Sequence, residues 1–204
     1  YIFACSYEAT NISINSYLTL IDGTNSYTNA TQVTTSGLAN KTPAPDLFGI
    51  SNGNDGGSSS PYIITTPQAL QLLATYVNNR ESFGAQNVHK IFKLGNDINM
   101  SGIALEPIGK IVFTSTTTTY PYPFSGTFDG NGHKISNINI SKTKGNIGLF
   151  GYLAHGAIVK NLTLDHATMT GNYTGGIAGF NDQYSTITNC IVRNATITGQ
   201  YQAG

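Results

Sequence analysis

Short runs of alternating apolar and polar residues dominate the second half of the chain. Apolar side chains stand at Ile135, Ile138 and Ile140, and a similar pattern returns in residues 159–164 and 187–192. Alternation over so few residues is typical of short β-strands broken by turns, because successive side chains of a strand point to opposite faces. This part of the chain therefore predicts many short strands and no helix.

One upstream segment has the spacing of a helix instead. Thr66 can cap the helix, Pro67 suits its first position, and the segment is expected to end near residues 78–79. The apolar stripe between these ends consists of Leu70, Leu73, Ala74 and Val77. We expect this helix to cover the open edge of the first strands.

The strand region repeats itself at a fixed offset. Three segments recur 28 positions later, and a shorter match recurs after 24 positions, as expected if one corner loop changes length. Self-similarity of this kind indicates stacked repeats. The matched segments are 148–152 with 176–180, 161–164 with 189–192, 171–176 with 199–204 and, at the shorter offset, 137–140 with 161–164.

The length of the repeat selects the architecture. A period of 24 to 28 residues with about three strands and no helix excludes leucine-rich, ankyrin and tetratricopeptide repeats. The remaining solution is a coil of strands that stacks on the next coil, with right-handed crossovers. The fold predicted is an all-β, right-handed parallel β-helix, with Leu162 over Cys190 and Leu164 over Val192 in its core.

Glycines recur at fixed places in the repeat. Gly148 and Gly176 open matched segments, and Gly175 precedes the second of them. We interpret these three glycines as tight corners that need positive φ, which glycine adopts without steric cost.

Composition divides the chain into three parts. Residues 51–60 contain no apolar side chain and are rich in glycine and serine, which is typical of a linker. Residues 1–50 hold short alternating runs that do not match the repeat, and about fifty residues rarely support a core unaided. We therefore predict an N-terminal β segment over 1–50 that serves as a strand-exchange arm, a linker over 51–61 and a β-solenoid over 62–204.

Charge and hydropathy narrow the range of partners. The chain has 10 Lys+Arg and 10 Asp+Glu, so it carries no basic excess with which to bind phosphates. Its apolar runs, such as residues 111–113, are far shorter than the ~20 residues of a membrane helix. Neither nucleic-acid binding nor a membrane span is expected.

Cysteines and asparagines bear on the compartment. Cys5 and Cys190 are too few for a disulfide scaffold or a metal cluster, and two buried thiols are expected. The chain also holds eight Asn-x-Ser/Thr sequons, about twice the chance number, which favours secretion. These candidate glycosylation sites are Asn11, Asn29, Asn40, Asn99, Asn139, Asn161, Asn172 and Asn194.

Residues 124–138 read Phe-Ser-Gly-Thr-Phe-Asp-Gly-Asn-Gly-His-Lys-Ile-Ser-Asn-Ile, followed by Gly-Leu-Phe-Gly at 148–151 and Gly-Gly-Ile-Ala-Gly at 175–179. This series resembles the GLUG-type repeats of bacterial surface adhesins and related large extracellular proteins. Parts of residues 64–109 are similar to the lead-in before such repeats, so the resemblance covers roughly 62–204. It implies a secreted or surface-attached β-solenoid and supplies no catalytic residues.

Carboxylates are the groups most able to carry chemistry on a parallel β-helix. Polysaccharide-cleaving sites need acidic residues that converge, and this chain has few acidic residues. We interpret Asp129 as a turn residue, and Asp165, His166 and Asp182 as solvated corners, with Asp165 close to Arg193 one coil away. The chain is therefore expected not to be an enzyme, with no catalytic residue.

Metal and ligand sites are not expected either. Residues 52–55 resemble a calcium loop but lack its closing glutamate, and we interpret them as linker. Aromatic residues in 120–124 could stack on sugars, although packing against the coil is favoured. No cofactor is predicted, and no metal-ligand spacing is found among His89, His133, His155 and His166.

The favoured function is that of a non-catalytic extracellular structural or adhesin-type protein, located outside the cell or on its surface. The third copy of the motif is incomplete at Gly204 and residues 1–7 are apolar, so a strand of one copy is expected to complete the sheet of the next. Such head-to-tail contacts build a filament. The expected partners are further copies or a host or cell-surface receptor, with glycans as another class. A carbohydrate-binding or polysaccharide-cleaving module and a passive spacer of a larger secreted enzyme are the alternatives.

Overall fold

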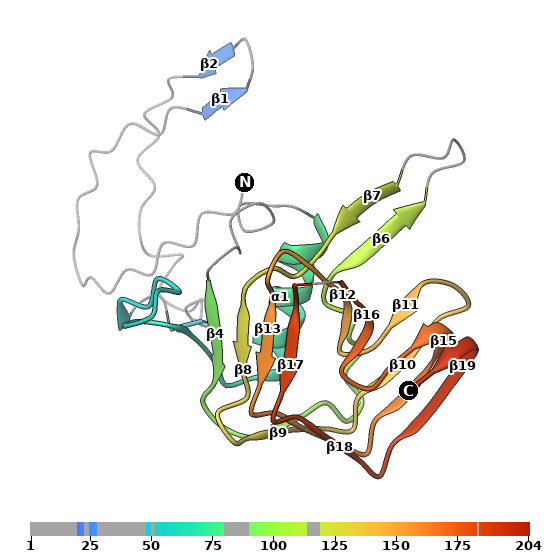
Figure 1. Cartoon of the computed structure of the whole chain (residues 1–204). Helices are drawn as coiled ribbons and strands as arrows, with labels where there is room; N and C mark the ends of the chain where they lie inside the picture. Colours follow the sequence, from blue (N-terminus) through green and yellow to red (C-terminus); the bar gives the residue numbers. More distant parts are fainter. Residues whose placement is uncertain are drawn as a thin grey trace. The chain divides into compact units, whose positions relative to one another are not determined.

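The chain forms two compact units, Tyr1–Pro45 and Asp46–Gly204. In the first unit, β1 (Leu20–Asp22) and β2 (Asn25–Tyr27) form an antiparallel pair. The second unit holds the other elements (Figure 1). The structure, a computed structural model, describes residues 20–22, 25–27, 48–49, 52–79, 90–113, 119–182 and 184–204.

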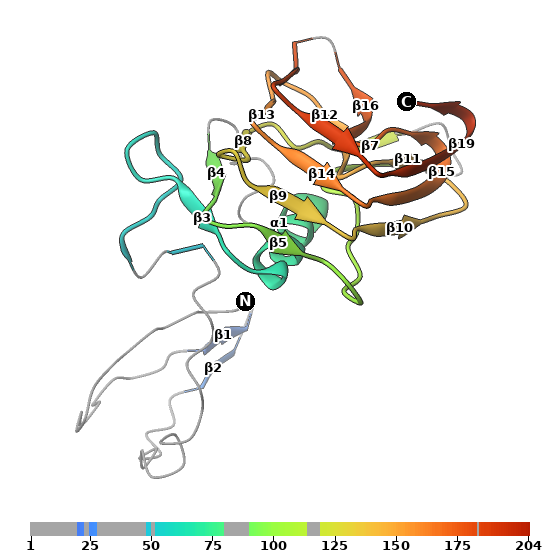
Figure 2. The same ribbon diagram turned by 90° about the horizontal axis from the view of Figure 1, so that it is seen from below.

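Parallel strands of the second unit wind into a coil, and each strand stacks on its counterpart in the next coil (Figure 2). The first wall contains, in stacking order, β3 (Tyr62–Ile64), β4 (Ile91–Leu94), β8 (Thr127–Asp129), β13 (Ile158–Lys160) and β17 (Thr186–Thr188). The second wall contains β5 (Ile98–Asn99), β9 (Lys134–Ser136), β14 (Thr163–Asp165) and β18 (Ile191–Arg193).

In the third wall, β10 (Asn139–Ser141) and β11 (Asn146–Ile147) both pair with β15 (Thr168–Thr174), which pairs with β19 (Thr196–Ala203). The fourth pairs β12 (Phe150–Leu153) with β16 (Ala178–Asn181). The predicted all-β parallel solenoid is confirmed.

Apolar residues stack in columns inside the coil. On the first wall, strand register places Tyr62, Phe92, Phe128, Val159 and Ile187 in one column. Phe128 and Val159 have no exposed surface, because coils cover them on both sides. The column mixes sizes, with Phe128 directly next to Val159, so the close-packed interior is filled by contacts from the other walls as well.

The predicted stacking on the second wall is also confirmed. Leu164 pairs in register with Val192. Leu162 and Cys190 directly precede the paired strands, and the amide of Ile191 donates to the Leu162 carbonyl at 2.8 Å. Cys190 packs against the core, and its partial burial raises the pKa of the thiol, as expected for a residue that fills space.

Helix α1 (Pro67–Asn79) has the predicted bounds and lies at the β5 end of the second wall (Figure 2). The Ala69 amide donates to Thr66 Oγ1 at 3.2 Å, which confirms the cap. At the other end, the buried Asn78 amide group donates to the Pro107 carbonyl at 2.9 Å and accepts from the Gly109 amide at 3.0 Å. The helix thus closes the interior at its first coil. Its residues in the core are Ala69, Leu70, Leu73, Ala74 and Val77.

The predicted 24-residue spacing is wrong. Asn139 pairs with Thr168, 29 positions later, so residues 137–140 do not lie over residues 161–164. The error has a physical cause: asparagine followed by alternating apolar residues stands at one corner in Asn161 and at a different corner in Asn137. Sequence similarity alone therefore aligned two different corners. The coil that contains β13 to β16 also has four strands rather than about three.

The predicted role of three glycines is wrong as well. Gly148, Gly175 and Gly176 do not have positive φ. A Cβ on Gly175 would lie 2.2 Å from the Ala178 carbonyl oxygen, and one on Gly148 would lie 2.9 Å from the Gly175 carbonyl oxygen. These glycines are required because backbones approach closely at this corner, not for conformational freedom.

Two further segments join the coil. Strands β6 (Lys110–Phe113) and β7 (Thr119–Tyr122) form an antiparallel hairpin that projects from it (Figure 1). In the glycine-rich segment, Asp55 Oδ1 accepts from the Gly57 amide at 2.8 Å, and the Lys90 ammonium donates to the Asp55 carbonyl at 2.7 Å. Residues 55–60 therefore pack beside β4, while the predicted domain boundaries stay a prediction. Within the described residues, no helix is long and apolar enough to cross a membrane.

Candidate functional site

Polar residues with left-handed backbone occupy two corners of the coils from β8 onward. Asn161 (φ 54) and Asn189 (φ 51) lie between the first and second walls. Asn137 (φ 57), His166 (φ 56) and Asn194 (φ 51) lie between the second and third walls. Asparagine is one of the few residues that tolerate this conformation. Since the flanking strands pair in register, side chains of successive coils meet at each corner.

The first corner carries a ladder of hydrogen bonds between coils. The Asn189 side-chain amide donates to Asn161 Oδ1 at 2.7 Å, and the Asn161 amide donates to Asp129 Oδ1 at 3.0 Å. The Asn131 backbone amide also donates to Asp129 at 2.8 Å, which confirms the predicted turn role. Partial burial raises the pKa of Asp129, but these hydrogen bonds outweigh it and the net pKa lies below the usual range.

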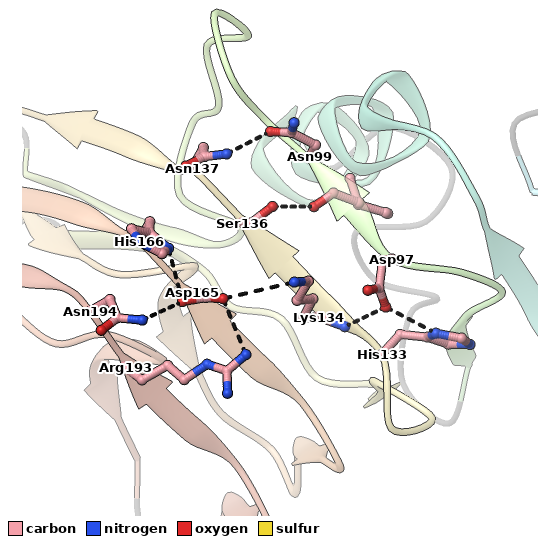
Figure 3. A network of polar contacts seen from close by, with 11 residues as sticks. Asp97, Asn99, His133, Lys134, Ser136, Asn137, Asp165, His166, Arg193 and Asn194 are labelled. Atoms are coloured by element: carbon pink, nitrogen blue, oxygen red, sulfur yellow. Dashed lines mark hydrogen bonds and ion pairs between the residues drawn. The ribbon is translucent and has the colours of Figure 1, made fainter.

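Asp165 is the centre of a polar cluster at the second corner (Figure 3). Its carboxylate accepts from the Asn194 amide at 2.9 Å and from Arg193 Nη2 at 3.2 Å. His166 Nδ1 lies 2.9 Å away and Lys134 Nζ lies 3.9 Å away. The hydrogen bond from Asn194 is the largest cause that lowers the pKa of Asp165, and those from Arg193 act in the same direction against the effect of burial.

The cluster continues along the second wall (Figure 3). The Lys134 backbone amide donates to Asp97 Oδ1 at 3.1 Å, and His133 Nδ1 lies 3.2 Å from the same oxygen. The Asn137 amide donates to Asn99 Oδ1 at 2.9 Å. Polar contacts thus join all four strands of this wall. They hold neighbouring coils together and fix the register in which their strands pair.

Replacing Asp165 with asparagine should make the free energy of unfolding fall less steeply as the pH is lowered into the acid range. The folded-state pKa of Asp165 is lowered, so its stabilisation is present above the unfolded-state pKa of about 3.9 and is lost as pH falls through the folded-state value. Urea unfolding between pH 7 and pH 2 measures this. The exposed Glu106→Gln change, at a carboxylate that pairs with Lys142, is the control and should retain the slope. An unchanged slope in D165N would contradict the assigned contacts.

The remaining predicted polar residues fall into different classes. The predicted Asp165–Arg193 pair is confirmed, but Asp165 is only 6% exposed and is not the solvated corner expected. Asp182 is half-buried, and the Tyr152 hydroxyl donates to its carboxylate at 3.4 Å. Within the described residues, no group of three or more His, Cys, Asp or Glu side chains is placed to hold a metal ion.

Several predicted residues lie apart from the network or outside the described residues. Phe124 is fully buried, so its ring cannot stack on a sugar, and Tyr122 lies against Lys110. His155 is exposed. His89 and Cys5 lie outside the described residues.

The predicted glycosylation sites differ in surroundings. The Asn161 and Asn194 amides are engaged with Asp129 and Asp165, while Asn172 is half-buried. Asn139 and Asn99 are exposed on the outside of the coil. Glycosylation at any of them stays a prediction, and Asn11, Asn29 and Asn40 lie outside the described residues.

Sequence reasoning missed most of the polar ladder. Asn189 and Lys134 were not singled out, and Asn194 was noted only as a sequon. Their signal is positional: polar residues follow the short strands at matched places in the repeat. This positional signal can be recognised only when the pairing register of the strands is known.

The last described coil, formed by β17, β18 and β19, exposes inward positions that are buried in the coil before it. Ile187 and Val192 are each 37% exposed, whereas their register partners Val159 and Leu164 have no exposed surface. We call the surface formed by Ile187, Cys190, Val192 and the adjoining edge of β17 and β18 the end face.

Sequence comparison finds similar known proteins. Halomucin of Haloquadratum walsbyi is 31% identical over 164 residues, which is 75% of this chain and 2% of that protein. A putative Gly-rich membrane protein of Evansella cellulosilytica is 31% identical over 151 residues, or 69% of this chain and 15% of that protein. No solved structure gives a significant match. Residues 170–198 match the family model of the GLUG motif, which is consistent with the predicted resemblance to GLUG-type repeats.

Proposed function

We propose that the chain is a non-catalytic structural module of a cell-surface protein, of the kind used for display or adhesion. One observation carries the proposal: the polar residues that could have formed a reactive site are bonded between coils. Asp97, Asp129 and Asp165 each accept at least two hydrogen bonds or ion pairs from the wall around them. Such groups fix register rather than meet a substrate.

The groove beside α1 supports the same reading. It has a volume of about 370 Å³ and is lined mainly by polar residues, from the helix and from residues 104–110. Glu106 is the acidic residue of its lining, and this carboxylate already pairs with the Lys142 ammonium. General acid–base hydrolysis of a glycan requires a second carboxylate at a defined separation.

The surface location rests on the GLUG motif and on the relatives. One relative is named as a halomucin and another as a putative membrane protein, and this chain spans a small part of each. A stiff coil with exposed sequons such as Asn139 suits a glycoprotein segment held outside the cell. The module then acts as a spacer or a display element within a larger assembly.

Filament formation is the finer part of the proposal. The end face presents unpaired strand edges and apolar side chains, including Ile187 and Val192, which are each 37% exposed. A strand supplied by another copy would pair with this edge by β-augmentation. The contact is head-to-tail, so it extends into a filament instead of closing into a ring.

Glycan binding is the second candidate, and exposed aromatic pairs favour it. The rings of Tyr173 and Tyr201 lie 5.7 Å apart on the outside of β15 and β19, with Tyr201 64% exposed. Aromatic rings with a polar tip suit amphipathic ligands such as sugars. Binding on a glycan array that Tyr201→Ala abolishes would establish this candidate in place of adhesion through protein contacts.

Immunogold electron microscopy of cells that produce the protein tests the first proposal. Label on the cell surface, along fibres or a continuous layer, is the expected result. Label confined to the cell interior would overturn the surface assignment. Release of reducing ends from polysaccharides by the purified chain would overturn the non-catalytic assignment.

A further inference from the structure

The groove beside α1 is the hollow of the solenoid unit that has the size of a ligand site. Its volume is about 370 Å³, and its lining consists of described residues of the helix and of the segment that joins β5 to β6. Small-molecule sites in proteins measure roughly 300–1,000 Å³. The groove therefore has room for a ligand of one or two sugar rings.

The helix contributes a polar face to this groove. Gln71, Thr75 and Asn79 follow one another at four-residue spacing, so they lie on one side of α1, opposite its apolar stripe. Asn79 is exposed, and its side chain makes no hydrogen bond to any described residue. Its amide group is therefore free to bind a polar ligand.

Hydrogen bonds fix the opposite wall of the groove to the helix. The Gln71 side-chain amide donates to the Ala104 carbonyl at 2.6 Å. Further along the helix, the Asn78 amide group binds the backbone of Pro107 and Gly109. The two walls are thus tied together at two places, and a preformed site of this kind loses little conformational entropy when a ligand enters.

The groove also has an unbalanced positive charge. Lys110 Nζ lies 5.5 Å from the centre of the Tyr122 ring, and no carboxylate of the described residues lies within ion-pair distance of it. The Glu106 carboxylate is different, because it pairs with the Lys142 ammonium. One ammonium in the lining is therefore left to pair with an anionic group of a ligand.

The other polar groups of the lining call for a ligand with hydroxyls. The side-chain oxygens of Gln71, Asn79 and Glu106 are acceptors, and a ligand hydroxyl can donate to each of them. Inorganic phosphate at neutral pH is mainly an acceptor, and its charge has the same sign as that of the Glu106 carboxylate. A uronic acid carries both kinds of group that the groove requires, one carboxylate and several hydroxyls.

We propose that the groove beside α1 binds a uronic acid residue of an extracellular polysaccharide. The carboxylate of the sugar pairs with the Lys110 ammonium, and its hydroxyls donate to Gln71, Asn79 and Glu106. The sugar is bound without cleavage, because hydrolysis of a glycosidic bond requires two carboxyl groups and the lining holds one. The inference goes beyond the proposed display role, and it concerns a different place from the tyrosine pair on β15 and β19.

Calorimetric titration of the full chain with digalacturonate tests the class of ligand. A dissociation constant below about 1 mM is expected, with at least tenfold weaker binding of the uncharged galactobiose. Inorganic phosphate, the third probe, should not displace digalacturonate. Equal binding of galactobiose, displacement by phosphate, or no binding of digalacturonate would each overturn the assignment of a uronic acid.

Three variants test the place of binding. Lys110→Met should weaken digalacturonate binding at least tenfold and leave galactobiose binding within about twofold. Lys93→Met is the matched control, because it removes the same charge from a half-buried position on β4, outside the groove, and should leave both ligands unaffected. Ala104→Trp fills the groove without removing a polar side chain and should abolish binding of both ligands.

The variants also separate the groove from other sources of binding. Equal losses in K110M and K93M would indicate a general effect of charge and would overturn the groove as the site. Binding that survives A104W but is lost in Tyr201→Ala would overturn the groove and leave glycan binding by the tyrosine pair standing. Circular dichroism of each variant verifies that it is folded.

Discussion

Replacing Phe128 with alanine should lower the free energy of unfolding by about 4 kcal/mol. The ring has no exposed surface, stacks in the column between Phe92 and Val159, and meets Phe150 edge-on at a centroid distance of 5.4 Å. Truncation loses the transfer free energy of the ring and leaves a cavity between two fixed coils. Denaturant unfolding followed by circular dichroism measures the loss.

Ile187→Ala is the matched control, because Ile187 belongs to the same column one coil beyond Val159. Its side chain is 37% exposed, and one side of it faces no further coil. Its loss should cost under about 1.5 kcal/mol. An equal loss of stability in both variants would contradict the burial of Phe128 between two coils and the exposure of Ile187 on one side.

Gly179→Ala should destabilise the chain by about 3 kcal/mol, although glycine to alanine is usually a mild change. A Cβ at this position would lie 2.4 Å from the Ile147 backbone nitrogen. Backbone atoms of a paired strand cannot move aside as a flexible side chain can. The coils at this corner must therefore separate or tilt, and a thermal or denaturant melt reports the loss.

Gly95→Ala is the control for this position. The nearest atoms to its Cβ are the Thr65 and Ile63 methyl groups, at 2.8 and 2.9 Å, and Gly95 is exposed. These side-chain ends can shift, so the change should cost under about 1 kcal/mol. A G179A variant as stable as G95A would show that the coil corner is not closely packed.

The sequence predicted the architecture because the repeat expresses it directly. Leu164 over Val192 followed from the 28-residue offset alone, and the Thr66 cap with its apolar stripe followed from local chemistry. The offset of 24 failed because Asn137 and Asn161 occupy different corners with the same local pattern. The local sequence shows that a corner is present. Only the pairing register of the strands shows which two walls that corner joins.

The polar cluster was harder to predict, for a related reason. The Asp165–Arg193 pair was visible because both residues sit at the repeat offset. Lys134 and Asn194 approach the same carboxylate from strands on either side of it, so their roles depend on three coils at once. The burial of Asp165 could not be read from its polar neighbours in sequence.

The central claim is that one ladder of strands runs from Ile63 to Thr188. Register links Ile63 to Lys93, Asp129, Lys160 and Thr188 in turn. Spin labels at Ile63→Cys and Thr188→Cys, in a background of Cys5→Ser and Cys190→Ala, measure the end-to-end distance by pulsed electron paramagnetic resonance. The account predicts a narrow distribution near about 20 Å, from four strand spacings of about 4.8 Å. A broad distribution, or one centred beyond about 35 Å, would contradict a single stacked coil.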